Sequence, residues 1–229
     1  MDIIECLMNI GLTRHESVLY VALCKEGELT GYEAAKVSGI PRSNAYLALA
    51  GLVEKGGAFK IDSDAVKYTA VPVNEFVTNI RAKQNEIFDF IEKNIPVRDN
   101  IKNSYITVNG ETNILNKAKN MIAAASERIY ISVSADVAAH VLNVLKAAVA
   151  SGLKVVIITD SGFELDKAVI YHDSKQPGQI RLIVDTEYVL TGELSGIDPT
   201  CLYSSNKNLI QLIKETLTAE IKLIQESKK

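Results

Sequence analysis

The stretch TGYEAAKVSGIPRSNAYLALAGLVEKG, residues 30–56, holds two helical patterns on either side of a short turn, SGIPRS. Thr30 and Glu33 have the spacing of a capping box, in which each side chain satisfies a backbone N–H of the other residue. A helix is therefore predicted to begin there and to run to about Val37. The proline of the turn suits the first turn of a helix, where a missing N–H costs nothing. A second helix is predicted over Pro41–Lys55, and the two helices form a tight corner.

The segments around this corner extend the pattern. Residues 13–26 are predicted to form a preceding helix, because Thr13 and Glu16 repeat the capping-box spacing. After the corner, AFKI (58–61) and VKYTAV (66–71) are predicted to form a β-hairpin around the polar turn DSDA. This order of elements, three helices with a sharp corner between the last two and then a hairpin, is that of a winged helix-turn-helix. The second helix of such a corner lies in the major groove of DNA, and its N-terminal residues contact base edges.

The N-terminal end of the predicted helix over 41–55 carries side chains suited to base contacts. Arg42 can donate two hydrogen bonds to guanine, Asn44 can pair with adenine, and Ser43 can bond to a base or a phosphate. Tyr46 lies near the border of the exposed face, where its hydroxyl can reach a phosphate. The buried stripe is expected to be Ala45, Leu49, Leu52 and Val53, which leaves Arg42, Ser43, Asn44, Leu47 and Ala48 facing outward.

Lysines supply the remaining candidate DNA contacts. Lys60 and Lys67 flank the hairpin turn, and Lys55 closes the helix before it. Asp62 and Asp64 would repel phosphates, which argues against a hairpin tip that enters a groove. The net charge of the chain is −3 and no segment is strongly basic, so tight non-specific binding to nucleic acid is not expected. A winged helix that binds protein, as an adaptor, is the alternative interpretation.

Three short stretches within residues 12–76 are the most distinctive. They are the Leu-Thr-x-x-Glu opening, the Ile-Pro-Arg-Ser-x-x-Tyr turn and the exit KYTAVPVNEF. With them, the segment resembles the N-terminal domain of the TrmB family, the sugar-responsive transcriptional regulators of archaea and bacteria. The resemblance implies a recognition helix at Pro41–Lys55 and a helix after Pro72 that helps to form a homodimer. It also implies double-stranded DNA as the partner and a small, sugar-like molecule as the effector.

Residues 74–95 carry a longer helical pattern that is strongly apolar. Such a helix between two domains packs either on its own domains or against a second copy, as a parallel or antiparallel two-stranded contact. The winged helix is accordingly expected at 1–72, the linker or dimerisation helix at 73–98, and a further domain at 99–229. On the helix, one side carries Phe76, Ile80, Ile87, Ile91 and Ile95, with Val77 and Phe88 beside them and Gln84 interrupting the stripe.

From residue 103 onward, strand patterns alternate with helical patterns, which is typical of an α/β domain. Strands such as VVIIT are apolar on both faces, as buried central strands are. The predicted strands are SYITVNG, RIYISV, KVVIITD, KAVIYH, QIRLIVD and EYVLTGEL, and the predicted helices cover 111–126, 135–152 and 206–226.

Two stretches of this domain, residues 128–160 and 179–194, resemble the phospholipase D fold. In that family a His-x-Lys pair precedes an Asp and a Gly-Ser-type turn, and the His attacks the phosphodiester. Here Asp185 stands at the place of the Asp, Gly192-Glu193 replaces the turn, and Gly178–Arg181 contains no His. Without an imidazole nucleophile the two-step reaction cannot run. A non-enzymatic, phospholipase D-like effector or dimerisation domain is therefore expected, with a phosphodiesterase as the alternative.

Polar residues follow several predicted strands, at the ends where α/β sheets bind ligands. Ser132, Ser134, Asp160 and Asp185 are the candidate effector-binding residues, since hydroxyl and carboxylate groups suit a sugar or polyol. The same residue types are also ordinary helix caps and turn formers. No His, Cys or acidic cluster has metal-ligand spacing and no glycine-rich phosphate motif is present, so no metal or cofactor is expected.

The composition, with 47% hydrophobic and 23% charged residues, is that of an ordinary globular protein. No apolar run is long enough to cross a bilayer, and the first residues carry acids where a signal peptide carries Lys or Arg. A cytoplasmic protein without a membrane partner is therefore expected. Cys6, Cys24 and Cys201 are scattered and odd in number, which indicates packing residues or free thiols.

Overall fold

The computed structural model describes residues 2–62, 65–96 and 104–227. The chain divides into two compact units, Met1–Val97 and Arg98–Lys229. No helix among the described residues has the length and apolar character that a membrane span needs.

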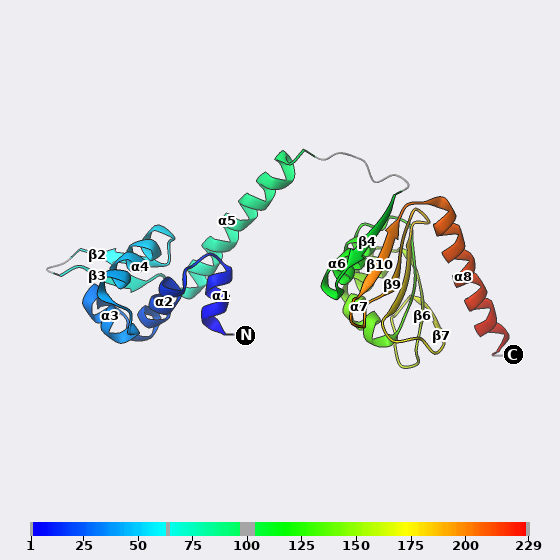
Figure 1. Ribbon diagram of the computed structural model, residues 1–229, viewed down its shortest axis with the longest axis horizontal. Coiled ribbons are helices and arrows are strands. Elements are labelled where there is room, and N and C mark those ends of the chain that lie inside the picture. Colours follow the sequence, from blue (N-terminus) through cyan, green and yellow to red (C-terminus); the bar gives the residue numbers. More distant parts are fainter. Residues whose placement is uncertain (1, 63–64, 97–103, 228–229) are drawn as a thin grey trace. The chain divides into compact units, whose positions relative to one another are not determined.

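The first unit consists of helices and a small antiparallel sheet (Figure 1). Its predicted helices and hairpin are confirmed to within one or two residues at each end. The fold differs from expectation in two additions, a short first helix and a two-residue strand that pairs with the hairpin in the order β1-β3-β2. The elements are α1 (Ile3–Asn9), α2 (Arg14–Glu26), β1 (Leu29–Thr30), α3 (Gly31–Ser38), α4 (Arg42–Glu54), β2 (Ala58–Ile61), β3 (Lys67–Ala70) and α5 (Val73–Asn94).

One apolar core holds this unit together. Leu19 of α2 and Leu49 and Leu52 of α4 are completely buried in it. Phe76 joins them from the first turn of α5 and contacts the ring of Tyr20, with 4.9 Å between ring centroids. The N-terminal part of α5 is therefore part of the winged-helix core.

The buried stripe of α4 differs from the predicted one at two positions. Ala48, expected to face outward, is buried, and Val53, expected to be buried, is 36% exposed. The buried positions 45, 48, 49 and 52 follow the i, i+3, i+4, i+7 pattern of one helix face. Val53 was assigned to the buried stripe because it is apolar, but it lies one residue beyond that face.

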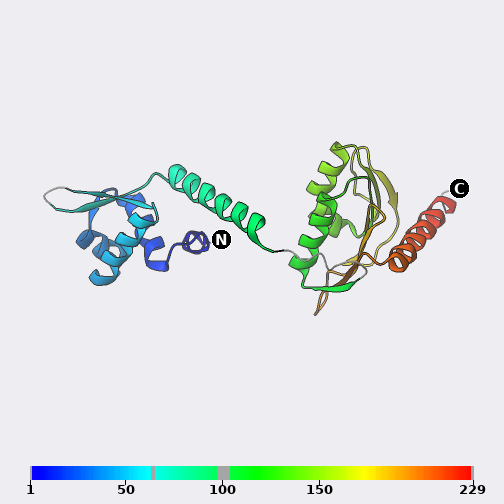
Figure 2. The same ribbon diagram turned by 90° about the horizontal axis from the view of Figure 1, so that it is seen from above.

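The second unit is a mixed seven-stranded sheet with helices on both faces. Helices α6 and α7 cover one face and α8 covers the other (Figures 1 and 2). Among the described residues the strand order is β4-β10-β9-β8-β5-β6-β7. The elements are β4 (Tyr105–Asn109), α6 (Glu111–Ala123), β5 (Arg128–Val133), α7 (Ala135–Ala150), β6 (Lys154–Thr159), β7 (Val169–His172), β8 (Gln179–Val184), β9 (Tyr188–Glu193), β10 (Thr200–Ser204) and α8 (Lys207–Glu226).

Strand direction changes in the middle of this sheet. β5, β6 and β7 are parallel, whereas β8 runs antiparallel to β5 and the remaining pairs continue antiparallel. β10 was not predicted from the sequence. Gly192, which falls within the predicted strand EYVLTGEL, lies within β9, opposite Ile180 and Cys201.

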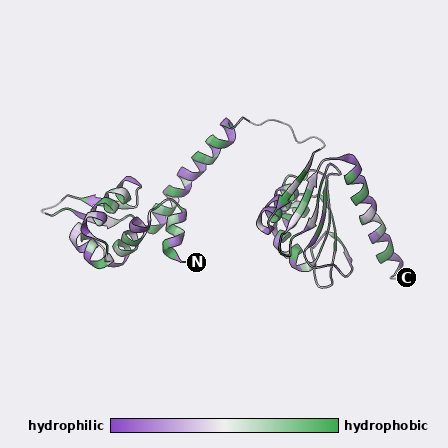
Figure 3. Ribbon diagram, in the orientation of Figure 1, coloured by the Kyte–Doolittle hydropathy of each residue, from purple (hydrophilic) through white to green (hydrophobic). Residues whose placement is uncertain are grey.

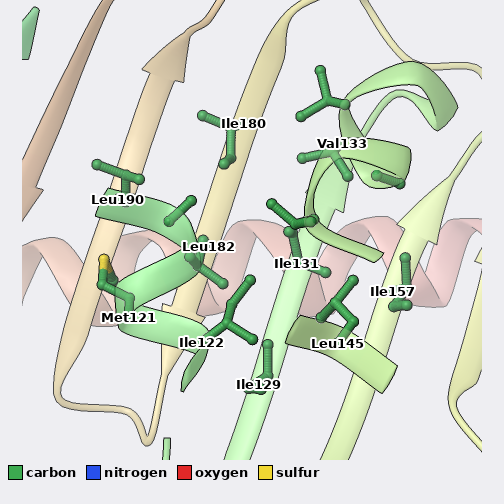
Figure 4. Close-up of a cluster of buried hydrophobic side chains, with 14 of the residues drawn as sticks. Met121, Ile122, Ile129, Ile131, Val133, Leu145, Ile157, Ile180, Leu182 and Leu190 are labelled. Atoms are coloured by element: carbon green, nitrogen blue, oxygen red, sulfur yellow. The ribbon is translucent and has the colours of Figure 1, made fainter. Parts of the chain in front are cut away.

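The main core of the second unit lies between the sheet and α6 and α7. Figure 4 shows side chains from both helices meeting those of β5, β6, β8 and β9. A smaller cluster, which includes Ile158, Ile183 and Leu217, packs α8 on the opposite face. The residues labelled in Figure 4 are Met121, Ile122, Ile129, Ile131, Val133, Leu145, Ile157, Ile180, Leu182 and Leu190.

Candidate functional site

The corner between α3 and α4 is fixed by local hydrogen bonds. Gly39 ends α3 in the left-handed conformation, with φ of 70°, which a glycine adopts without steric cost. The Ser38 hydroxyl donates to the carbonyl of Ala34 at 2.6 Å and accepts from the N–H of Ile40 at 3.3 Å. These contacts turn the chain sharply, so that α4 starts at the surface.

Arg42 is held in place by an aromatic ring. Its guanidinium carbon lies 4.1 Å from the centroid of the Tyr32 ring, which belongs to α3 and is half-exposed. A guanidinium that stacks on a ring loses little side-chain freedom when it binds a further group. Sequence reasoning missed Tyr32, and an exposed aromatic residue beside a helical corner was the available signal.

The other predicted residues of α4 lie near Arg42. Ser43 is exposed and Asn44 is partly exposed. Tyr46 is half-exposed, and its ring lies so close to Gly31 that a Cβ there would overlap it. Leu47 is 73% exposed, which adds an apolar side chain of the kind that contacts a thymine methyl group.

The first backbone amides of α4 are open to an outside partner. Pro41 occupies the N-cap position, and no side chain of the described residues caps this end of the helix. Uncapped N–H groups and the helix dipole both favour an anion at this position. A phosphate oxygen is therefore a suitable partner for the start of α4.

The two hairpin lysines are already paired with acids. Lys60 lies 2.9 Å from Asp62, and Lys67 lies 3.6 Å from Glu28. All four side chains are largely exposed, so each pair is weak and can be exchanged for a phosphate. Asp64, the second acid of the predicted hairpin tip, lies outside the described residues.

Lys55 has a partner inside the first unit. Its ammonium group donates to Glu16 at 2.7 Å and to the carbonyl of Gly11 at 3.0 Å. The Glu16 side chain is only 7% exposed. Burial opposes ionisation of Glu16, but the hydrogen bonds from Lys55 and Thr13 outweigh it and lower the pKa of the carboxyl. The predicted DNA contact of Lys55 would therefore have to compete with this internal carboxylate.

Three of the four predicted effector residues lie together at the carboxyl ends of two neighbouring strands of the large sheet. Ser132 is the next-to-last residue of β5 and Ser134 follows that strand, while Asp160 follows the neighbouring β6. The Asp160 carboxylate accepts the N–H of Ala135 at 3.0 Å and that of Lys175 at 2.8 Å. Asp160 therefore already connects the start of α7 to the loop after β7.

A group of charged residues that the sequence did not reveal lies near Ser132. The Ser132 hydroxyl is 3.5 Å from both carboxylate oxygens of Glu220 in α8. Lys175, whose side chain is 7% exposed, donates to the same carboxylate, and Arg181 lies 3.7 Å from it. Burial lowers the pKa of Lys175, although the charge of Asp173 acts in the opposite direction. Strands β5 and β8, helix α8 and the loop after β7 each contribute one residue, so only the folded chain brings these residues together.

Asp185 does not lie with the other three residues. β8 runs antiparallel to β5, so its carboxyl end faces the start of β5, and Asp185 donates its N–H to the carbonyl of Arg128. Its carboxylate accepts backbone N–H groups of Ser126, Glu127 and Arg128 at 2.8–2.9 Å. Burial opposes ionisation, but these bonds outweigh it and lower the pKa of Asp185. The predicted four-residue rim was therefore wrong at this position.

Two family models match the chain. The sugar-specific transcriptional regulator TrmB matches residues 7–74, and the EBD N-terminal subdomain of the transcriptional regulator TrmB matches residues 105–216. YrhO of Bacillus subtilis (strain 168) is 32% identical over 244 aligned residues, which cover 100% of this chain and 87% of YrhO. The chain belongs to the TrmB family. This TrmB-family protein is a DNA-binding transcriptional regulator.

A second relative and three solved structures are also similar to parts or all of this chain. The HTH-type sugar sensing transcriptional regulator TrmBL1 of Pyrococcus furiosus is 27% identical over 152 residues, 63% of this chain and 44% of TrmBL1. The structure of TrmBL2, an archaeal chromatin protein with a novel mode of DNA binding, matches with a TM-score of 0.50 and 21% identity over 96% of each chain. NucT from Helicobacter pylori (16% identical) and Nuc from Salmonella typhimurium, a phospholipase D family member (18% identical), each match with a TM-score of 0.40. They cover 52% and 51% of this TrmB-family chain and 97% and 93% of their own.

Proposed function

We propose that this regulator binds double-stranded DNA as a homodimer, with α4 of each copy in the major groove. Arg42, Ser43 and Asn44 contact base edges, and Tyr46 contacts a phosphate. The observation that carries the proposal is the exposed, uncapped start of α4 with Arg42 stacked on Tyr32. Lys60 and Lys67 contact the backbone beside the groove after they release their acidic partners.

Fluorescence anisotropy with duplex DNA from upstream of the protein's own coding region tests this. Arg42→Ala is expected to weaken specific binding by about 5- to 100-fold, because one bidentate base contact supplies about 1–3 kcal/mol of discrimination. Arg14→Ala is the matched control, since Arg14 is exposed and lies outside the α3–α4 corner and the hairpin. Binding at two salt concentrations separates base contacts from phosphate contacts. Equal affinity of Arg42→Ala and the wild type would overturn the assignment of α4.

We further propose that the second unit senses a small, sugar-like effector at the sheet edge formed by Ser132, Ser134 and Asp160. Two observations support this: the family model for the first unit is described as sugar-specific, and buried Lys175 and Glu220 supply polar groups close to that edge. A sensing rather than catalytic role is consistent with Gly178–Arg181, which offers no imidazole.

Effector binding acts by favouring one spacing of the two recognition helices, which requires a difference in effector affinity between the two arrangements. Calorimetric titration with a panel of sugars tests the site. Asp160→Asn is expected to weaken the binding of any sugar that the wild type binds, and His140→Asn, an exposed change on α7, is the control. If no sugar in the panel binds, or if Asp160→Asn binds like the wild type, the proposed effector site is wrong.

A further inference from the structure

A cavity of about 260 Å³ lies between α6 and the large sheet, at the end where β8 turns into β9. Asp185 at its rim bonds to the start of β5, whereas Ser132 lies near the end of that strand, so this cavity is separate from the proposed sugar site. An apolar cavity of about 150 Å³ holds one benzene molecule, so there is room here for a single six-membered ring with a polar substituent. The lining residues include Lys117, Asn120 and Met121 of α6, Val184 of β8, Tyr188 of β9 and Tyr203 of β10.

Two tyrosine rings form the sheet side of this cavity. The rings of Tyr188 and Tyr203 lie nearly parallel, with 9° between their planes and 6.1 Å between their centroids. Tyr203 is buried, whereas Tyr188 is 39% exposed and presents its ring to an incoming group. Met121 and Val184, both buried, add apolar surface. Such a wall suits an aromatic ring, because stacked aromatic pairs gain more than their buried area alone supplies.

The cavity also contains a lysine without a counter-ion. The ammonium group of Lys117 lies 3.6 Å from the centroid of the Tyr203 ring, and no carboxylate of the described residues forms an ion pair with it. Burial lowers the pKa of this lysine. An ammonium group that is partly removed from water gains from an anionic partner. One cation balances one negative charge, which suits a carboxylate better than the nearly double charge of a phosphate monoester.

Asn120 lies next to Lys117 along the cavity. The two residues are three positions apart on α6, so their side chains are neighbours on one helix face. Figure 3 shows hydrophobic and hydrophilic residues alternating along α6, and these two lie beside its buried residues. An ammonium group and an amide N–H can each donate to one oxygen of a carboxylate. A carboxylate held in this way lies against α6, while the ring that carries it lies against Tyr188.

The acid at the rim of the cavity already has its partners. Asp185 accepts three backbone N–H groups and the hydroxyl of Ser126, so its charge is satisfied without Lys117. Asp185 and Thr186 both lie in the left-handed region, with φ of 52° and 60°, which is rare for a β-branched residue. Strain of this kind is found at ligand sites and persists only where other contacts hold it. The bonds to Asp185 hold this turn, and with it the position of Tyr188.

We propose that this cavity binds a single-ring aromatic carboxylate, with its ring stacked on Tyr188 and its carboxylate held by Lys117 and Asn120. The observation that carries the proposal is an unpaired cation beside an aromatic wall, in a cavity of the size of one ring. A neutral sugar would leave the charge of Lys117 unpaired. This second ligand site does not depend on the sugar site proposed above, and either can fail without the other.

Calorimetric titration of the full-length protein compares three probes. Benzoate has both the aromatic ring and the charge, benzyl alcohol has the ring without the charge, and glucuronate has the charge on a sugar ring. Benzoate is expected to bind with a millimolar or smaller dissociation constant, as suits a ligand of so few atoms. Benzyl alcohol should bind at least about tenfold more weakly, because it cannot form the charged hydrogen bond to Lys117. Glucuronate that binds as tightly as benzoate, or benzoate that does not bind at millimolar concentration, would overturn the proposal.

Two variants assign the contacts. Lys117→Met keeps an alkyl chain and removes the charge, so it is expected to weaken benzoate binding at least about tenfold and to leave benzyl alcohol unchanged, whereas damage to the fold would weaken both. Tyr188→Ala is expected to weaken both probes by about two- to tenfold. Lys119→Met, on the same helix but outside the cavity, is the matched control. Benzoate that binds Lys117→Met like the wild type, or that is weakened equally by Asp160→Asn, would overturn the proposal.

Discussion

At the scale of single residues, the pair formed by Glu16 and Lys55 shows how a charge is retained inside the winged helix. The Glu16 carboxylate closes the capping box of α2 by accepting the N–H of Thr13 at 2.6 Å, and it also accepts from Lys55 at 2.7 Å. A Cβ at Gly51 would overlap this carboxylate. One buried group therefore connects the start of α2 to the end of α4, and Gly51 leaves the space for it.

We expect Lys55→Met to destabilise the first unit by about 1–2 kcal/mol, because it leaves Glu16 without its cation, although the lysine is partly exposed to solvent. The pKa of Glu16 is lowered in the folded state, so its contribution is complete above 4.5, the value of a free glutamate, and is lost as pH falls through the folded value. The difference from the wild type should therefore shrink as the pH falls below 4.5. Urea unfolding at several pH values measures this.

Lys36→Met, a change of an exposed lysine on α3, is the control for that experiment. A Lys55→Met difference that persists unchanged at low pH would contradict the assigned pairing with Glu16.

Gly192 is the other residue with a sharp structural requirement. Its φ is 152°, and an added Cβ would lie 2.7 Å from the Cα of Cys201 and would overlap the carbonyl of Thr200. Gly192→Ala is expected to destabilise the second unit by about 2–4 kcal/mol, since strain and overpacking add. Gly196→Ala, where φ is 121° but no atom lies within 4 Å, should cost about 1 kcal/mol by strain alone. If the two changes destabilise the second unit equally, β10 must shift to make room for the methyl group added at position 192.

At the scale of elements, local signals set most of the helices. The capping boxes at Thr13 and Thr30 and the glycine after α3 fixed the boundaries of α2 and α3 to within a residue or two. The signal was weaker for α1, whose seven residues contain one buried side chain, Leu7. β1 is two residues long and exists because it pairs with β3, so no local pattern could predict it.

Some residues of the candidate sites could likewise be predicted from local sequence, whereas others depend on how the elements pack. Arg42, Ser43 and Tyr46 could be predicted because their exposure follows from helix periodicity near a recognisable corner. Tyr32 could not be paired with Arg42 from the sequence, since the contact depends on the angle between α3 and α4. The misplacement of Asp185 arose because residues that follow strands share an edge only when those strands are parallel.

The hairpin provides a test at this scale. Asp62→Asn is expected to raise DNA affinity by about two- to fivefold and to steepen the salt dependence, because it frees Lys60 to neutralise a phosphate. Fluorescence anisotropy at two salt concentrations measures both. Glu26→Gln, which removes an exposed carboxylate at the end of α2, is the control. Unchanged affinity of Asp62→Asn would show that β2 and β3 do not contact DNA.

At the scale of the whole molecule, each of the two units has an apolar core of its own among the described residues. Two thermal transitions are therefore expected in scanning calorimetry. Leu49→Ala should lower the midpoint temperature of one transition and Leu190→Ala that of the other. Each change should reduce the free energy of unfolding of its unit by about 2–5 kcal/mol, because both side chains are completely buried. The transition lowered by Leu49→Ala should also rise with protein concentration if the expected dimerisation helix, α5 of the same unit, joins the two copies. A single transition that both changes lower would show that the units unfold together.

The pairing of β4 with β10 has a consequence for synthesis on the ribosome. β4 opens the sheet, but its only described strand neighbour is β10, and the Ser204 hydroxyl bonds to the carbonyl of Ser104 across 100 positions of the chain. While translation proceeds, the nascent β4 has no strand of the described sheet to pair with until β10, residues 200–204, has emerged. Late closure of this kind makes folding slow and leaves an unpaired edge for a chaperone to shield.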